Sequence, residues 1–187
     1  MKLYVIRHGQ SQTNETRCYT GWSQVQLTQK GIDGAKSVRP LLENVTFDKI
    51  YSSDLIRARQ TAEIILPGCS YEQTPLLREI GMGTWENQPI ASYAPEDKIL
   101  AAKAGYDAWG GESRADFRQR IRDFMVLAAN SGCETVAAFS HRGWLMGMLD
   151  EVIGVQYTGG VTCNNCAVAV FTCTDGIWRL YSWINSF

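Results

Sequence analysis

The chain contains two histidines, and each follows a short apolar run. His8 follows residues 3–6 after a single arginine, and His141 follows residues 135–139 after a single serine. A neutral imidazole can attack an electrophile or exchange a proton near pH 7. One histidine after a strand is more often structural than catalytic. Two histidines at equivalent strand ends indicate shared chemistry.

Arginines and a carboxylate follow apolar runs in the same way. Arg7 follows the first run, Arg57 comes soon after the second, and Arg78 and Glu79 follow a weaker third. The carboxyl ends of parallel strands meet at one edge of an open α/β sheet, where ligands bind. A guanidinium group can donate two parallel hydrogen bonds to two oxygens of a phosphate group. This set of residues therefore predicts a phosphate pocket with one acid beside it. Two simpler interpretations stay open: Arg57 on an exposed helix face, and Glu79 in an ion pair with Arg78.

A regular alternation of strands and helices must position these residues. Short apolar runs predict strands, and amphipathic stretches with capping residues predict helices between them. We expect strands at residues 3–6, 47–51, 70–73, 135–139, 168–171 and 178–183, and helices at residues 27–43, 54–66, 90–104, 113–130 and 143–153. The last two strands flank a turn signal and form a hairpin. This order predicts an α/β fold, a three-layer α/β/α sandwich with a mostly parallel, mixed sheet.

Length and charge limit the kind of protein. The chain has 187 residues and no linker or repeat, so we expect a single domain over residues 1–187. The net charge of −1 gives no case for binding nucleic acid or a membrane. The apolar run at the N-terminus is too short for a signal peptide, and no run is long enough to cross a bilayer. We therefore expect a cytoplasmic protein.

Six cysteines are expected to be free thiols in a reducing cytoplasm. Cys163 and Cys166 have the C-x-x-C spacing that occurs in zinc and redox sites. A zinc site needs further ligands, but the sequence has no second pair at similar spacing, and its histidines lie elsewhere. The spacing therefore does not predict a metal centre, and we expect the protein to bind no metal.

Six ordered segments resemble the conserved blocks of one enzyme family. They are RHGQSQTN at 7–14, TGW at 20–22 followed by LTQKG at 27–31, SSDLIRARQTA at 52–62, LREIGMGTWE at 77–86, GGES at 110–113, and SH at 140–141. Together they resemble the histidine phosphatase superfamily, also called the phosphoglycerate mutase-like family, over about residues 2 to 145. The first block alone is a weak signal, whereas six blocks in order are a strong one.

The resemblance implies a phosphoglycerate mutase-like fold and a phosphotransfer that needs neither metal nor cofactor. It implies that His8 attacks phosphorus, and that Glu79 protonates the leaving group and then activates water. Peptide N–H groups that open the helix after His141 are expected to contact an anion. The residues implied in phosphate binding are Arg7, Asn14, Thr20, Gly21, Arg57 and His141, of which the two arginines and the histidine also have catalytic roles.

Three positions depart from the family pattern. Gln10 stands where glutamate is commoner, and we expect this change to matter little. Asn87 stands where glycine often follows the Trp-Glu pair, which predicts a differently shaped loop beside the acid. Arg142 follows the second histidine where glycine is usual. Its side chain is either simply exposed or a further cation that binds a second anionic group of the substrate.

Three functions are compatible with the resemblance. Mutases of the family tend to be longer, so this short chain favours a phosphomonoester hydrolase over phosphoglycerate mutase-type phosphotransfer. A non-catalytic phosphoester-binding protein would be expected to lack His8, Glu79 or His141, and all three are present. The expected partner is a small phosphorylated substrate, such as a sugar phosphate, a phosphoglycerate or α-ribazole phosphate. The terminal hairpin also offers an edge for a possible homodimer.

Overall fold

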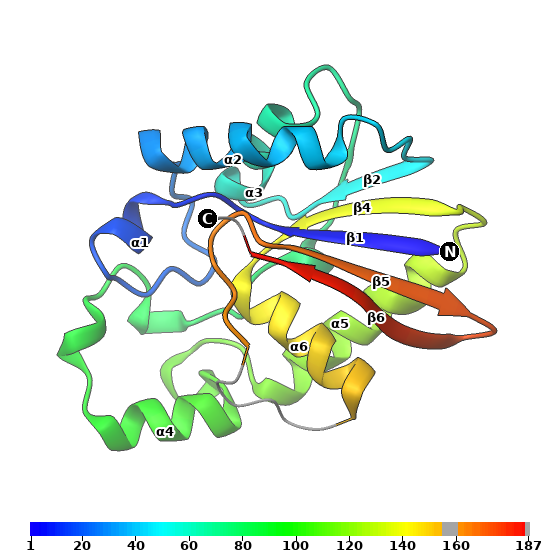
Figure 1. Cartoon of the computed structure of the whole chain (residues 1–187). Coiled ribbons are helices and arrows are strands. Elements are labelled where there is room, and N and C mark those ends of the chain that lie inside the picture. The colour runs from blue at the N-terminus through cyan, green and yellow to red at the C-terminus, as the bar shows by residue number, and fades with distance from the viewer. Residues whose placement is uncertain (155–160, 186–187) are drawn as a thin grey trace.

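A computed structural model describes residues 1–154 and 161–185 of the chain. Within them, the strands are β1 Lys2–Arg7, β2 Lys49–Ser52, β3 Glu72–Gln73, β4 Thr135–Ser140, β5 Val168–Thr174 and β6 Ile177–Ile184. They form one sheet in the order β3-β2-β4-β1-β5-β6 (Figure 1). The first four strands are parallel, and β5 is antiparallel to both of its neighbours. The sheet is therefore mixed and mostly parallel, as predicted.

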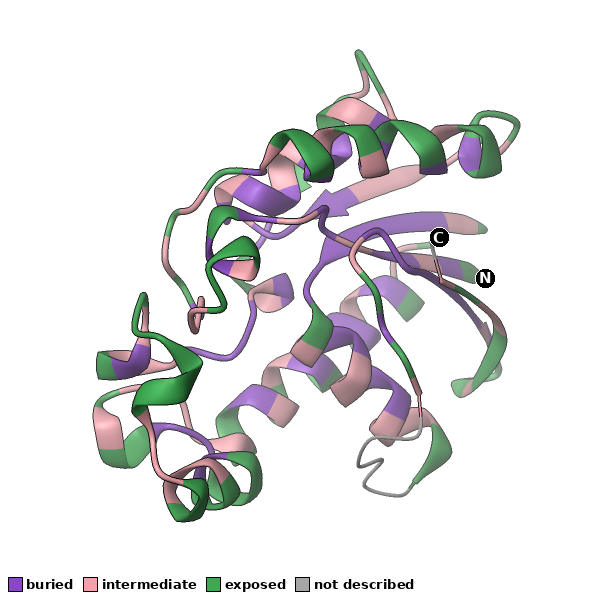
Figure 2. Cartoon of the chain, turned by 60° about the vertical axis from the view of Figure 1, so that its left-hand side comes forward, coloured by how far each residue is buried: buried purple, intermediate pink, exposed green. Residues whose placement is uncertain are grey.

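Helices cover both faces of this sheet. They are α1 Gln12–Glu15, α2 Gln29–Leu42, α3 Ile56–Ile65, α4 Pro95–Ala104, α5 Arg114–Ala129 and α6 Arg142–Ile153. Figure 1 shows α2 and α3 on one face and α5 and α6 on the other. Side chains of a strand alternate between the faces, so Leu3 and Val5 join one hydrophobic core and Ile6 joins the other. Figure 2 shows the buried strands between the helices. The predicted three layers are confirmed.

The stretch predicted as a helix at residues 90–104 is interrupted. Ile90–Ser92 form a single 3₁₀ turn, and α4 begins only at Pro95. Proline disfavours helical backbone in the residue before it, and Ala94 accordingly has φ −64° and ψ 151°, an extended conformation. Figure 1 shows α4 apart from the two helical layers on the sheet. This segment therefore lies outside the α/β/α core.

The carboxyl ends of β1 and β4 lie side by side. The parallel register pairs Arg7 with Ser140, the last residues of the two strands. The end of β2 lies next to β4 on its other side. Because His8 and His141 each follow their strand directly, they emerge next to one another at this edge of the sheet, as the sequence predicted.

β6 forms an edge of the sheet and exposes several large side chains, Ile177 and Tyr181 among them. Unpaired strand edges are sites at which another chain can add. A homodimer through β6 stays a prediction. In the described ranges, no helix combines the length and the apolar character needed to span a bilayer.

Candidate active site

A cavity of about 680 Å³ opens at the edge of the sheet where the two histidines emerge. Its volume lies in the usual range of small-molecule sites. Of the residues predicted from sequence, those that border it are Arg7, His8, Asn14, Thr20, Arg57, Glu79 and Arg142. Gly21 and His141 are not part of its wall, although each contacts a residue that is. The fold therefore brings most of the residues predicted from the sequence together at this cavity.

His8 is held in one tautomer by its neighbours. Its Nδ1 lies 2.6 Å from the carbonyl oxygen of Gly9, an acceptor, so Nδ1 carries the proton and donates. Its Nε2 lies 3.3 Å from Nε of Arg57, which can only donate. Nε2 therefore keeps its lone pair. A buried imidazole in this state can act as a nucleophile.

The surroundings of His8 keep it neutral. Burial lowers the pKa of His8 well below 6.5, and the positive charges of Arg57 and Arg7 lower it further. Burial also lowers the pKa of Arg57, to about 10, so its guanidinium remains charged near neutral pH. The site thus places an uncharged nucleophile beside a buried cation, an arrangement that favours attack on a phosphate group.

Arg57 is fully buried near the start of α3 and is held by backbone oxygens. Its Nη1 donates to the carbonyl oxygen of Ser23 and its Nη2 to that of Gly21, both at 2.9 Å. An exposed position on a helix face, the simpler interpretation of Arg57, is wrong. These hydrogen bonds leave the guanidinium of Arg57 little freedom to turn away from His8.

Glu86 fixes the loop that carries these carbonyl oxygens. Its Oε1 accepts a hydrogen bond from the backbone N–H of Trp22 at 2.8 Å, and its Oε2 accepts one from Oγ of Ser23 at 3.0 Å. Gly21 has φ 52°, and a Cβ atom there would lie only 2.2 Å from Oε1 of Glu86. Two distant sequence blocks, Thr-Gly-Trp and Trp-Glu, therefore act together to position Arg57.

Glu79 is held by two backbone N–H groups. Its Oε2 accepts from Gly143 at 2.9 Å and its Oε1 accepts from Ile80 at 3.0 Å. Arg78 pairs instead with Asp54, with Nε 2.7 Å from Oδ1, so the alternative of an Arg78–Glu79 ion pair is wrong. The expectation that the N–H groups opening α6 contact an anionic ligand is also wrong for Gly143, because its N–H group is taken by Glu79.

His141 is fully buried and packs against His8. The centroids of the His8 and His141 rings are 5.1 Å apart, and Nε2 of His141 lies 2.9 Å from Oγ of Ser53. Burial, followed by the charge of Arg57, lowers the pKa of His141 well below 6.5. Its buried Nδ1 has no hydrogen-bond partner among the described residues. Such a group costs roughly 1–3 kcal/mol, which a ligand oxygen would relieve.

Asn14 is oriented by a residue that sequence reasoning missed. Oδ1 of Asn14 accepts from the backbone N–H of Ser11 at 3.2 Å and from Nδ2 of Asn165 at 3.1 Å. Nδ2 of Asn165 also lies 3.1 Å from the carbonyl oxygen of His8. Oγ1 of Thr20 lies 2.7 Å from that of Thr13. No sequence signal marks Asn165, because its contacts depend on how β1 and the segment before β5 meet.

Comparison with known proteins identifies the family. The chain matches the model of the histidine phosphatase superfamily, branch 1, over residues 3–186. This chain belongs to that family. It is 34% identical to the adenosylcobalamin/α-ribazole phosphatase of Salmonella typhimurium, over 78% of this chain and 76% of the relative. It is 29% identical to a probable phosphoglycerate mutase, GpmB, of Yersinia pestis, over 98% of this chain and 90% of the relative.

A solved structure agrees with this assignment. The α-ribazole phosphatase of Shigella flexneri superimposes with a TM-score of 0.87 at 25% identity, over 98% of this chain and 96% of that chain. The similarity therefore extends over nearly the whole length of both proteins. The protein is a phosphomonoesterase of the histidine phosphatase type, as the sequence predicted.

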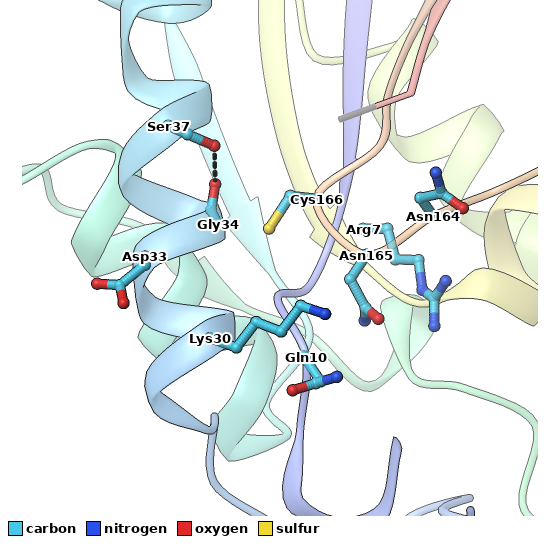
Figure 3. Close-up of a pocket in the computed structure, with 9 residues that line it drawn as sticks. All are labelled: Arg7, Gln10, Lys30, Asp33, Gly34, Ser37, Asn164, Asn165 and Cys166. Atoms are coloured by element: carbon cyan, nitrogen blue, oxygen red, sulfur yellow. Dashed lines mark hydrogen bonds between the residues drawn. The ribbon is translucent and has the colours of Figure 1, made fainter. Parts of the chain in front are cut away.

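Arg7 of this histidine phosphatase also borders a second cavity, of about 530 Å³. Figure 3 shows this cavity between α2, which carries Lys30, and the segment that carries Asn165 and Cys166. Nη1 of Arg7 donates to the carbonyl oxygen of Cys163 at 2.5 Å, while its buried Nε has no partner among the described residues. His8 and Glu79 border the first of these two cavities and not the second.

Asn87 does not require the different loop shape that we predicted. Its φ is 63°, in the left-handed region that glycine and asparagine adopt most readily. Its Nδ2 donates to Oγ of Ser23 at 2.9 Å, on the loop that holds Arg57. Asn87 therefore has a backbone conformation that glycine also adopts, and it adds a contact to the loop that holds Arg57. A loop shape different from that of glycine-containing relatives stays a prediction.

All six cysteines of this phosphatase are free thiols. Burial raises the pKa of both members of the C-x-x-C pair, Cys163 and Cys166, and that of Cys166 reaches about 11. A thiol with a raised pKa is a poor nucleophile near neutral pH. No group of three or more potential metal-ligating side chains occurs within residues 1–154 and 161–185.

Proposed function

We propose that this enzyme is a single-domain, metal-independent hydrolase of a small phosphorylated metabolite, and that the reaction passes through a phosphohistidine on His8. One observation carries the proposal. Nδ1 of His8 is engaged by Gly9, so the lone pair lies on Nε2, next to the buried cation of Arg57. In-line attack on phosphorus requires this state of a histidine.

In the proposed first step, Nε2 of His8 forms a bond to phosphorus and the bond from phosphorus to the ester oxygen breaks. Glu79 gives its proton to the departing oxygen. Arg7 and Arg57 stabilise the charge on the remaining phosphoryl oxygens. The proposal is supported by the cavity itself, since all four side chains border it.

In the proposed second step, Glu79 takes a proton from a water molecule, whose oxygen attacks phosphorus while the bond to Nε2 breaks. Phosphate leaves and His8 returns to its neutral state. Asn14, Thr20 and the buried Nδ1 of His141 are proposed as further phosphate ligands. Gly21 is proposed to act through Arg57, whose guanidinium its carbonyl oxygen holds.

The names of the relatives suggest two substrates to test. An α-ribazole phosphatase is 34% identical to this chain, so α-ribazole phosphate is a candidate substrate for hydrolysis. The similarity to a probable phosphoglycerate mutase favours a second function, in which the phosphoryl group of His8 returns to the bound product instead of passing to water. The two functions differ in their product, which is free phosphate in one case and an isomer of the substrate in the other.

The test is a hydrolysis screen over phosphomonoesters, with a chelator present, for wild type, His8→Ala and His141→Ala. We expect wild type to release phosphate and His8→Ala to lose at least about 10⁴-fold in kcat/KM, because no other group can carry the phosphoryl intermediate. Rapid quenching should trap phosphohistidine in wild type and in His141→Ala, but not in His8→Ala.

Undiminished turnover in His8→Ala would contradict the covalent mechanism. Loss of activity in the chelator would contradict metal independence. Conversion of a phosphoglycerate to its isomer without release of phosphate would favour the mutase. His141→Ala is the matched control, since it removes the other histidine of the chain and leaves the proposed nucleophile in place.

A further inference from the structure

The active-site cavity is much larger than a phosphate group. Its inner wall is defined here as Arg7, His8, Arg57 and Glu79, which follow strand ends. Its outer wall comes from the segment 90–118, which includes α4 and the start of α5, and from α6. If phosphate occupies the inner wall, as proposed above, most of the 680 Å³ is left for the rest of the substrate.

The outer wall combines apolar side chains with cations. Ile90, Ile99, Tyr106, Phe117 and Met146 border the cavity together with Lys103, Arg114, Arg118 and Arg142. Two acids, Glu79 and Asp150, also border it. Among the described residues, positive side chains therefore outnumber negative ones around the cavity, even after Arg7 and Arg57 are assigned to the phosphate.

Two of the four additional cations are already engaged. Arg118 forms an ion pair with Glu151, with Nε 2.6 Å from Oε1. Nη2 of Arg114 donates to carbonyl oxygens at the end of α4, that of Ala102 at 3.0 Å. These contacts hold α4, α5 and α6 together and explain both arginines without a ligand.

Arg142 and Lys103 differ from Arg114 and Arg118. Both are exposed, and neither has a hydrogen-bond or ion-pair partner within residues 1–154 and 161–185. Arg142 is the first residue of α6, directly after His141 and before the glycine that holds Glu79. Burial is the main reason why the pKa of Arg7 is low, and the charge of Arg142 lowers it further.

We propose that Arg142, assisted by Lys103, binds a second anionic group of the substrate, so that the enzyme prefers phosphomonoesters that also carry a carboxylate or another phosphate. This inference rests on the proposed phosphatase function. A guanidinium without a protein partner can form two parallel hydrogen bonds with such a group. The apolar side chains of the outer wall then cover the part of the substrate between its two charges.

The test compares two esters that differ in a single group. Glycerate 3-phosphate carries a carboxylate where glycerol 3-phosphate carries a hydroxymethyl group. We expect Arg142→Gln to lower kcat/KM for glycerate 3-phosphate by about 10- to 100-fold, the value of one charged hydrogen-bonded pair, and to change that for glycerol 3-phosphate by less than about 2-fold. Lys103→Gln should have the smaller effect on the same substrate.

Arg122→Gln is the matched control. Arg122 lies on the same helix as Arg118 and pairs with Glu151, but it does not border the cavity. The control removes one positive charge without touching the proposed subsite, and both esters should keep their wild-type kcat/KM. A bisphosphate paired with its monophosphate provides a second arm, which separates recognition of a phosphate from that of a carboxylate.

Two outcomes would overturn the inference. Arg142→Gln lowers kcat/KM equally for both esters, or wild type shows no preference for the acidic ester in either arm. Failure of the phosphatase mechanism would look different, because para-nitrophenyl phosphate would then not be hydrolysed in a His8-dependent way. Binding of glycerate 3-phosphate to His8→Ala, with and without Arg142→Gln, decides the subsite even in that case. Equal affinities would contradict it.

Discussion

His8, Arg57 and Glu79 on the inner wall of the cavity are 4%, 0% and 9% exposed, whereas Ile90 and Ile99 on the outer wall are 42% and 56% exposed. The inner residues follow strands of a sheet that is covered on both faces. Ile90 and Ile99 belong to the segment 90–104, which lies outside the α/β/α core and contacts it through α5. Under the proposed function, reaction chemistry takes place where the fold allows little movement, and substrate selection takes place where exposed residues can change at little cost to stability.

The two walls also differ in how their charges are satisfied. Each side chain of the inner wall has at least one hydrogen bond with the backbone: Arg7 with Cys163, His8 with Gly9, Arg57 with the loop before α2, and Glu79 with α6. Arg142 and Lys103 have no such partners within the described ranges. If this contrast is correct, substitutions of the inner wall should affect every substrate, and those of the outer wall only some.

Glu79→Gln should have the largest effect among changes that leave the nucleophile in place. We expect kcat for an alkyl phosphate to fall by about 10²- to 10⁴-fold, because a poor leaving group needs a proton. The loss should be much smaller for para-nitrophenyl phosphate, whose leaving group needs none. The measurement is kcat for both substrates. Equal losses for the two would mean that Glu79 is a structural anchor of α6 rather than the acid.

Gly143→Ala tests whether the backbone sets the position of the acid. A Cβ atom at residue 143 would lie 2.2 Å from Oε1 of Glu79, so the carboxylate must move. A displacement of this kind should lower kcat by roughly 10- to 100-fold for alkyl phosphates. The double variant, Gly143→Ala with Glu79→Gln, should have a kcat only slightly lower than that of Glu79→Gln alone.

The control for this variant is Gly34→Ala. Residue 34 also lies in a helix, and its added Cβ would meet only Sγ of Cys166, at an ordinary 3.5 Å. We expect Gly34→Ala to keep the wild-type kcat and to be slightly more stable, because alanine is a better helix former than glycine. If Gly143→Ala behaved in the same way as Gly34→Ala, the contact between α6 and Glu79 would not matter for catalysis.

The buried histidines should make stability depend on pH, with a smaller effect. Burial and the nearby arginines hold the pKa values of His8 and His141 well below 6.5. Below about pH 6.5 the unfolded chain therefore binds a proton on each histidine that the folded protein does not. The free energy of unfolding should fall by about 1.4 kcal/mol per histidine for each pH unit below that value, and these groups should contribute no change above it.

Urea unfolding between about pH 5 and pH 7 measures this dependence. His8→Ala should show a smaller slope than wild type, by about one proton, because its only remaining histidine is His141. Identical slopes would mean that His8 is protonated in the folded enzyme. That result would contradict the proposal that His8 is a neutral nucleophile.

The sequence predicted the residues of the inner wall better than the groups that hold them in place. Arg7, His8, Arg57 and Glu79 could be found because apolar runs mark the strands, and each of these residues follows one. The exposure of Arg57 was undecided, because burial depends on a loop that comes before α2 in the chain. The carbonyl oxygens of that loop carry no side-chain signal at all.

Residues whose role depends on tertiary packing could not be predicted. Ser53 contacts His141 across 88 residues, and Asn165 contacts the backbone of His8 across 157 residues. Gly143 has an ordinary helical position, and only the approach of Glu79 explains why a side chain does not fit there.

The place of β1 in the sheet has a consequence for synthesis. This first strand pairs with β4 on one side and with β5 on the other, so both of its neighbours come from the last third of the chain. His8 leaves the ribosome early, but its Asn165 contact does not exist until the segment before β5 has been translated. Pairing between such distant segments is slow and comes late in folding. We therefore expect nascent chains that end before β5 to have no activity.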